Sequence, residues 1–82
     1  MKLPRDLGGE ELATRLGKYG YQVVRQSGSH IRLTSTYKDT EHHLTIPRHK
    51  PLRVGTLNGI INEVAAYLEM EKQNLIDDLF GR

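Results

Sequence analysis

The segment Gly28-Ser29-His30-Ile31-Arg32 contains the residue types best suited to chemistry on a phosphodiester. A histidine after a glycine turn has a fixed backbone and an exposed ring, and an imidazole changes its charge near cellular pH. His30 could therefore take a proton from a ribose 2′-hydroxyl or give one to a leaving 5′-oxygen. Arg32 shares that side of an extended chain and could hold the phosphate through two N–H groups. The alternative is an exposed histidine with no chemical role.

A second group of charges lies between Pro47 and Pro51, where Arg48, His49 and Lys50 follow one another. The two prolines stiffen this stretch and predict a loop. Lysines and arginines on such a loop bind the phosphates of a nucleic acid without reading its sequence. The alternative is a loop whose charges are only solvated.

The charges are unevenly distributed along the chain. Its 82 residues have a net charge of +2, but residues 25–53 contain six lysines and arginines against two acids, together with all four histidines. Residues 63–82 contain five acids against two bases. A basic middle followed by an acidic end indicates an anionic partner, of which nucleic acid is the most common kind.

The remaining residue types exclude several other classes of protein. The chain has no cysteine and no His-x-x-x-His pair, so we expect no metal site, and no nucleotide loop or other motif implies a cofactor. Neither a signal-peptide core nor an apolar run of about 18 residues is present, so we expect no membrane insertion and a cytoplasmic location.

Apolar periodicity predicts the elements that position these residues. A helical stripe ends at Gly20, and two strands, Tyr21–Gln26 and Ser29–Ser35, are joined by a turn at Ser27-Gly28. A third strand covers His42–Pro47. Helices are expected over 54–68, with Thr56 as the N-cap or one turn inside, and over 71–79.

The alternation within the strands assigns their two faces. Ile31 and Leu33 point to the core, which places His30 and Arg32 on the opposite face. His43 and Thr45 share that outer face if the second and third strands are neighbours.

Together these elements predict an α+β fold with the order α-β-β-β-α(-α), in which residues 1–82 form a single domain. A three-stranded antiparallel sheet has its helices on one face and leaves the other face open, as in double-stranded-RNA-binding domains.

Several short segments, in this order and spacing, resemble the HicA toxin family, also called YcfA-like, over nearly the whole chain. The matching segments are Lys2-Leu3-Pro4-Arg5, Gly20-Tyr21, Val24-Arg25-Gln26, Gly28-Ser29-His30-Ile31-Arg32, His43-Leu44-Thr45-Ile46-Pro47, His49-Lys50-Pro51-Leu52 and Gly55-Thr56-Leu57. The resemblance implies the toxin of a type II toxin–antitoxin pair, which cleaves mRNA without a metal through a catalytic histidine, here His30. It also implies a HicB-type antitoxin that covers this histidine, and a higher-order toxin–antitoxin complex. Gly8-Gly9 departs from the serine-like N-cap that we expect before the first helix.

The leading hypothesis is an endoribonuclease in which His30 is catalytic and Ser29, Arg32, Arg48 and Lys50 bind RNA phosphates. The main alternative is a non-catalytic RNA-binding module of the same fold. A subunit that binds only a partner protein is a third possibility.

Overall fold

The computed structural model describes residues 3–81. The bounds of its elements are α1 Gly9–Leu16, η1 Gly17–Tyr19 (a 3-10 turn), β1 Gln22–Ser27, β2 His30–Ser35, β3 His42–Pro47, α2 Val54–Leu68 and α3 Lys72–Phe80. The three strands form one antiparallel sheet in the order β1-β2-β3. This arrangement confirms the predicted α+β fold and the order of its elements.

Helix α1 begins where the chain passes very close to the end of β3. The backbone N–H of Gly9 donates to the carbonyl of His49 at 2.9 Å. A Cβ atom at Gly9 would lie 1.9 Å from the Pro47 carbonyl oxygen, so only glycine fits there. Gly20 has a φ of 80° and ends the helical stretch, as the sequence predicted, but the last turn of that stretch, Gly17–Tyr19, is a 3-10 helix and not part of α1.

Strands β1 and β2 form the predicted hairpin, but its turn lies one residue later than expected. Ser27 pairs with His30, so the turn residues are Gly28 and Ser29 and not Ser27 and Gly28. Gly28 has a φ of 56°, a left-handed value that glycine adopts without strain. A two-residue turn with a positive φ at its first position therefore takes Gly28 there, and His30 becomes the first residue of β2.

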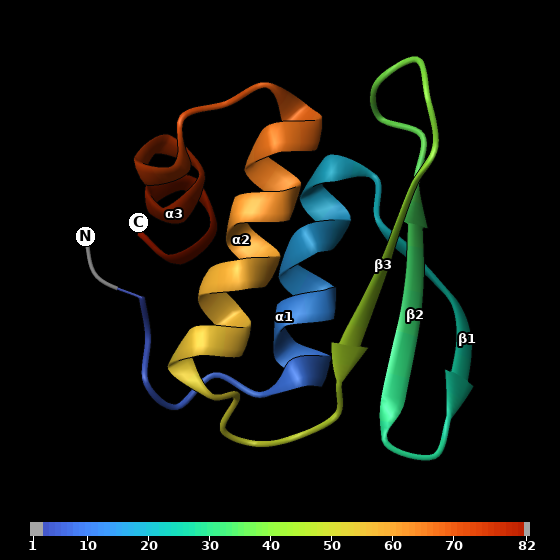
Figure 1. Cartoon of the computed structure of the whole chain (residues 1–82), viewed down its shortest axis with the longest axis vertical. Coiled ribbons are helices and arrows are strands. Elements are labelled where there is room, and N and C mark those ends of the chain that lie inside the picture. Colours follow the sequence, from blue (N-terminus) through green and yellow to red (C-terminus); the bar gives the residue numbers. More distant parts are fainter. Residues whose placement is uncertain (1–2, 82) are drawn as a thin grey trace.

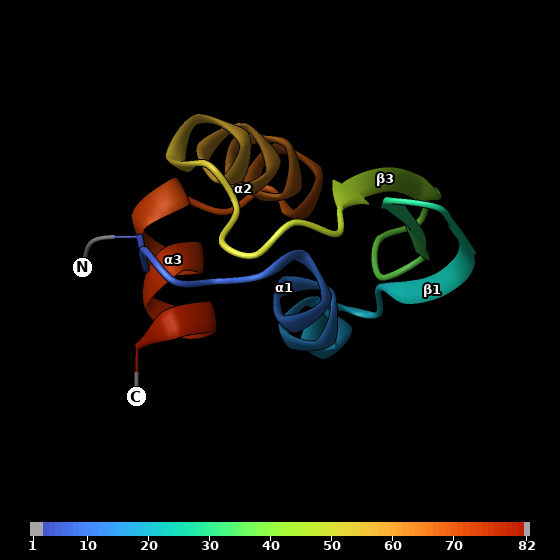
Figure 2. The same ribbon diagram turned by 90° about the horizontal axis from the view of Figure 1, so that it is seen from below.

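The sheet has one buried face and one open face. Ile31 and Leu33 pair with Ile46 and Leu44 of β3, and all four side chains are buried. Both α1 and α2 pack on this face, and α3 lies beyond them on the side away from the sheet (Figures 1 and 2). His30 and the other outward-facing residues of β2 therefore lie on the face that the helices leave uncovered, as predicted.

Strand β1 is less well covered than the other two strands. Its register with β2 is irregular between Val23 and Arg25, and all six of its residues are exposed. A bulge of this kind increases the local twist and makes an edge strand a poorer template for further pairing.

Helix α2 begins one residue after Arg53, so Thr56 lies in its first turn and is not the N-cap. Helix α3 buries Leu75, Ile76 and Leu79, as its periodicity predicted. Its end is tied to the first helix, because Arg15 Nη1 donates to the Leu79 carbonyl at 2.7 Å.

The 3-10 turn is also held to α3. The hydroxyl of Tyr19 donates to Asp78, and the ammonium of Lys18 lies 2.8 Å from the same carboxylate. Burial, followed by the hydrogen bond to Asp78, raises the pKa of Tyr19 to about 12. The hydrogen bonds from Lys18 and Tyr19 lower the pKa of Asp78.

Within residues 3–81, no helix combines the length and the apolar character needed to cross a lipid bilayer.

Candidate active site

His30 is presented at the corner of the open sheet face, directly after the hairpin turn. It lies opposite Ser27 of β1 and Pro47 of β3. The side chain is exposed, and its Nδ1 atom lies 3.5 Å from the Ser29 hydroxyl, at the outer limit of a hydrogen bond. Its other ring nitrogen has no hydrogen-bond partner among residues 3–81 and is accessible to a substrate.

Two arginines flank this histidine. Arg32 of β2 pairs across the ladder with Arg25 of β1, and both are exposed. Neither guanidinium has an acidic partner within residues 3–81. Together with three polar neighbours they enclose a hollow of about 310 Å³, lined by Arg25, Ser27, His30, Arg32 and Thr45. No carboxylate lines it, so the hollow favours an anion.

Sequence reasoning did not select Arg25 as a site residue. With the turn at Ser27-Gly28, Arg25 would face His30 and not Arg32. Either register places Arg25 on the outer face, because residues directly opposite each other share a face. The two-residue turn starting at Gly28 decides only that its partner is Arg32.

Arg48 lies beside the hairpin turn, where its guanidinium already has partners. Its Nε and Nη2 atoms are 2.8 and 2.7 Å from Glu10 Oε2, and Nη1 donates to the Gly28 carbonyl at 3.3 Å. Its backbone N–H donates to the Ser29 carbonyl at 2.7 Å. Arg48 is therefore brought to the candidate site, but most of its contacts are within the protein.

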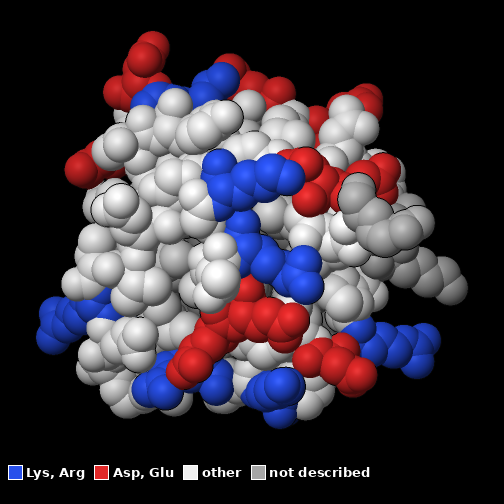
Figure 3. Space-filling view, turned by 180° about the vertical axis from the view of Figure 1, so that it is seen from behind, with Lys and Arg blue, Asp and Glu red and all other residues white. Residues whose placement is uncertain are grey.

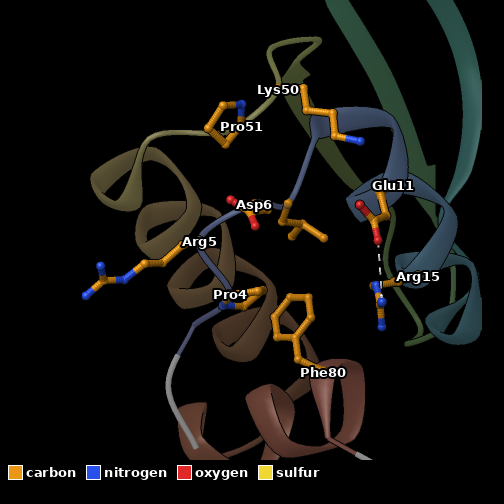
Figure 4. A pocket seen from close by; sticks show the side chains of 9 residues that line it. Pro4, Arg5, Asp6, Glu11, Arg15, Lys50, Pro51 and Phe80 are labelled. Atoms are coloured by element: carbon orange, nitrogen blue, oxygen red, sulfur yellow. Dashed lines mark ion pairs between the residues drawn. The ribbon is translucent and has the colours of Figure 1, made fainter.

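Lys50 lines a different and larger hollow of about 660 Å³ between the N-terminal segment, α1, the loop after β3 and α3 (Figure 4). On the α1 side of this hollow, Arg15 and Glu11 form an ion pair with an N–O distance of 3.5 Å. Lys50 is exposed and has no ion pair within residues 3–81. The structure thus separates Lys50 from the hollow that contains His30.

Basic and acidic side chains are intermixed on one face of the molecule. On the face opposite to that of Figure 1, lysines and arginines alternate with aspartates and glutamates (Figure 3). The two arginines at the hollow of His30 differ from the charges of that face, because they have no acidic partner within residues 3–81.

The other histidines have separate environments. His43 lies on the outer face with His30, as predicted, but its Nδ1 is 3.0 Å from the Thr34 hydroxyl and its Nε2 is 3.5 Å from Glu41. His42 is half-buried between Tyr21 and Glu63. Within residues 3–81, no three His, Asp or Glu side chains converge as a metal site requires.

A comparison with known protein families matches residues 9–65 to the family described as HicA toxin of bacterial toxin–antitoxin systems. The match covers more than half of the chain. The chain belongs to the HicA toxin family. No curated protein and no solved structure matches it. Its role is therefore that of the toxin in a toxin–antitoxin pair.

The HicA match includes the whole sheet, the hairpin turn, the basic loop and most of α2. Leu3-Pro4-Arg5 and α3 lie outside the matched range, and Lys2 lies outside the described residues. The part of this HicA-family toxin that carries the candidate site is thus the part that the family shares.

Proposed function

We propose that this HicA-family toxin is a metal-independent endoribonuclease that cleaves messenger RNA with His30 as its catalytic residue. The observation that supports the proposal best is the exposed His30 beside Arg25 and Arg32, two facing arginines that lack acidic partners within residues 3–81. A backbone phosphate would supply the missing negative charge and would lie within reach of the imidazole.

In the proposed reaction, the neutral imidazole of His30 accepts the proton of a ribose 2′-hydroxyl while the 2′-oxygen bonds to phosphorus. The bond from phosphorus to the 5′-oxygen breaks, and the leaving oxygen takes a proton from water or from the imidazolium. The products are a 2′,3′-cyclic phosphate and a 5′-hydroxyl. Arg25 and Arg32 stabilise the charge that the phosphoryl oxygens gain in the transition state.

Three further residues bind phosphate in this proposal. Ser29 holds the imidazole ring and contacts the scissile phosphate. Lys50 contacts a neighbouring phosphate, because it follows Pro47, the cross-strand partner of His30, by only three residues. Three residues reach at most about 11 Å. Arg48 uses three of its five N–H groups within the protein, which leaves two for RNA.

The toxin role requires an antitoxin, and we propose a HicB-type partner that covers His30 in a higher-order cytoplasmic complex. Acidic groups of this partner would pair with Arg25 and Arg32, which blocks the hollow to RNA.

The direct test incubates a purified mRNA in EDTA with the wild-type protein and with His30→Ala. We expect fragments only with the wild type, because the substitution removes the acid–base group from an exposed position that the fold does not need. RNA that stays intact with both proteins, or that both proteins fragment equally, overturns the catalytic role of His30.

One observation favours a second function, a non-catalytic RNA-binding module. The other residues that line the hollow of His30 are two arginines, a serine and a threonine, so no second histidine and no carboxylate faces the imidazole there. An RNA shift on a native gel without any cleavage by the wild type would support this module.

A further inference from the structure

We infer that the ion pair between Glu10 and Arg48 is a positioning element that holds His30 for the proposed cleavage. The inference rests on the proposed function, since it assigns a role within that reaction. It assigns Arg48 a role in placing the catalytic residue, in addition to any contact with RNA.

The first step concerns Arg48 and the hairpin turn. Its backbone N–H donates to the Ser29 carbonyl at 2.7 Å, and its Nη1 donates to the Gly28 carbonyl at 3.3 Å. These two turn residues directly precede His30, so both contacts act on the peptide units that set the start of β2.

The second step concerns what fixes Arg48. One carboxylate oxygen of Glu10 accepts from both Nε and Nη2, at 2.8 and 2.7 Å. The Glu10 backbone is itself fixed, because the start of α1 abuts the Pro47 carbonyl with no room for a Cβ atom at Gly9. The carboxylate therefore holds the guanidinium over the turn from a rigid base.

The third step is electrostatic. The Glu10 carboxylate lies in the basic loop region and would repel an RNA phosphate. If Glu10 acted only through its charge, its neutralisation would improve RNA binding and leave turnover unchanged. If it positions His30, neutralisation lowers turnover even though binding improves. The two roles thus predict different values of kcat, which stays unchanged if Glu10 acts only through its charge and falls if Glu10 positions His30.

The pair is exposed, with relative side-chain accessibilities of 40% for Arg48 and 62% for Glu10. Exposed ion pairs contribute little to global stability. We therefore expect the loss of this ion pair to change the conformation only locally, in the turn and at His30. The urea midpoint of unfolding should change little.

The experiment compares Glu10→Gln, Arg48→Gln and the double variant with the wild type on an RNA oligonucleotide that the wild type cleaves. We expect Glu10→Gln to lower kcat about two- to fivefold with KM unchanged or lower, as loss of an exposed pair implies. Arg48→Gln should lower kcat further, and the double variant should cleave no more slowly than Arg48→Gln alone, because the two residues act as one unit. Glu11→Gln is the matched control, since it removes the same charge and the one ion pair of Glu11 within residues 3–81 is with Arg15 of its own helix.

Two outcomes overturn the inference while the wild type remains a nuclease. One is a kcat for Glu10→Gln equal to that of Glu11→Gln. The other is a higher KM with an unchanged kcat in Arg48→Gln, which makes Arg48 a phosphate contact only.

A readout that does not depend on cleavage separates this inference from the proposed function. Two NMR measurements report the conformation of the hairpin turn directly. They are the ring and backbone chemical shifts of His30 and the exchange rate of the Arg48 amide proton. We expect both to change in Glu10→Gln and not in Glu11→Gln. Unchanged signals in Glu10→Gln overturn the positioning role even if the wild type cleaves no RNA, whereas an inactive wild type with altered signals overturns only the proposed function.

Discussion

Arg25 lies directly opposite Arg32 across the β1–β2 ladder, and neither guanidinium has an acidic partner within residues 3–81. Like charges in facing positions destabilise a sheet by up to about 1 kcal/mol. The pair therefore lowers the stability of the hairpin while it places two positive charges without acidic partners beside His30.

This pair leads to the first prediction. We expect Arg32→Gln to unfold at the same or a slightly higher urea concentration at low salt, with a gain of about 0.5 kcal/mol. The same variant should bind single-stranded RNA more weakly, and the slope of log K against log salt should fall by about 0.7. Arg53→Gln removes the same charge outside this sheet face and serves as the control. An unchanged salt slope in Arg32→Gln would contradict a phosphate contact there.

The second prediction compares two glycines of the first helical region. Gly9→Ala places a methyl group on the Pro47 carbonyl and should cost about 3 kcal/mol in free energy of unfolding, because the end of β3 must move. Gly17→Ala has open space and a helical backbone, so it should stabilise by about 0.5 kcal/mol. Urea denaturation measures both. Equal midpoints for the two variants would show that the close approach at Gly9 does not limit the fold.

Gly9 also shows which parts of the fold the sequence can predict and which parts it cannot. Local patterns predicted every element except the separate 3-10 segment η1, because apolar periodicity and glycine turns act within a few residues. A serine-like N-cap was expected near Gly8-Gly9, and the N-cap is Gly8. Glycine at the next position, Gly9, follows from the Pro47 carbonyl, a neighbour far along the chain. Contacts of this kind depend on tertiary packing and cannot be derived from local preference.

The candidate site was predicted only in part, because some of its residues are brought together by tertiary contacts. The alternation in β2 placed His30 and Arg32 on the open face, because strand periodicity fixes the faces. The facing Arg25 depended on the register, which changed when the turn moved by one residue. The Glu10 partner of Arg48 joins α1 to the loop after β3, and no local pattern connects these segments.

The third prediction concerns stability at alkaline pH. Burial and Asp78 raise the pKa of Tyr19 to about 12, and burial also raises the pKa of Tyr21 far above its usual range. The unfolded chain loses these protons near pH 10 while the folded chain keeps them. The stabilisation is therefore complete below pH 10 and is lost as the pH rises toward the folded values.

Urea midpoints between pH 8 and pH 11.5 test this linkage. We expect the midpoint of the wild type to fall above pH 10, and the fall to be shallower in Tyr19→Phe, which has no phenolic proton at that position. Tyr37→Phe, at an exposed position in edge contact with the Tyr19 ring, should change the fall by less than Tyr19→Phe does. A fall that is equally steep in Tyr19→Phe would show that other groups cause the alkaline loss.

The fourth prediction concerns the half-buried His42, which joins β3 to α2 and to Tyr21, the residue directly before β1. The Glu63 carboxylate can only accept a hydrogen bond, so His42 Nε2, 3.0 Å away, carries the hydrogen. Nδ1 is then free to accept from the Tyr21 hydroxyl at 2.6 Å, and the Tyr67 ring stacks on the imidazole at 4.8 Å. We expect NMR of the ring nitrogens to show the Nε2–H tautomer for His42.

Tyr21→Phe leaves Nδ1 of His42 without this donor and should cost about 1 kcal/mol in free energy of unfolding. Tyr37→Phe should cost much less, because Tyr37 is exposed. Equal urea midpoints for these two variants, or an Nδ1–H tautomer in the wild type, would show that this chain of hydrogen bonds does not hold β3 against α2.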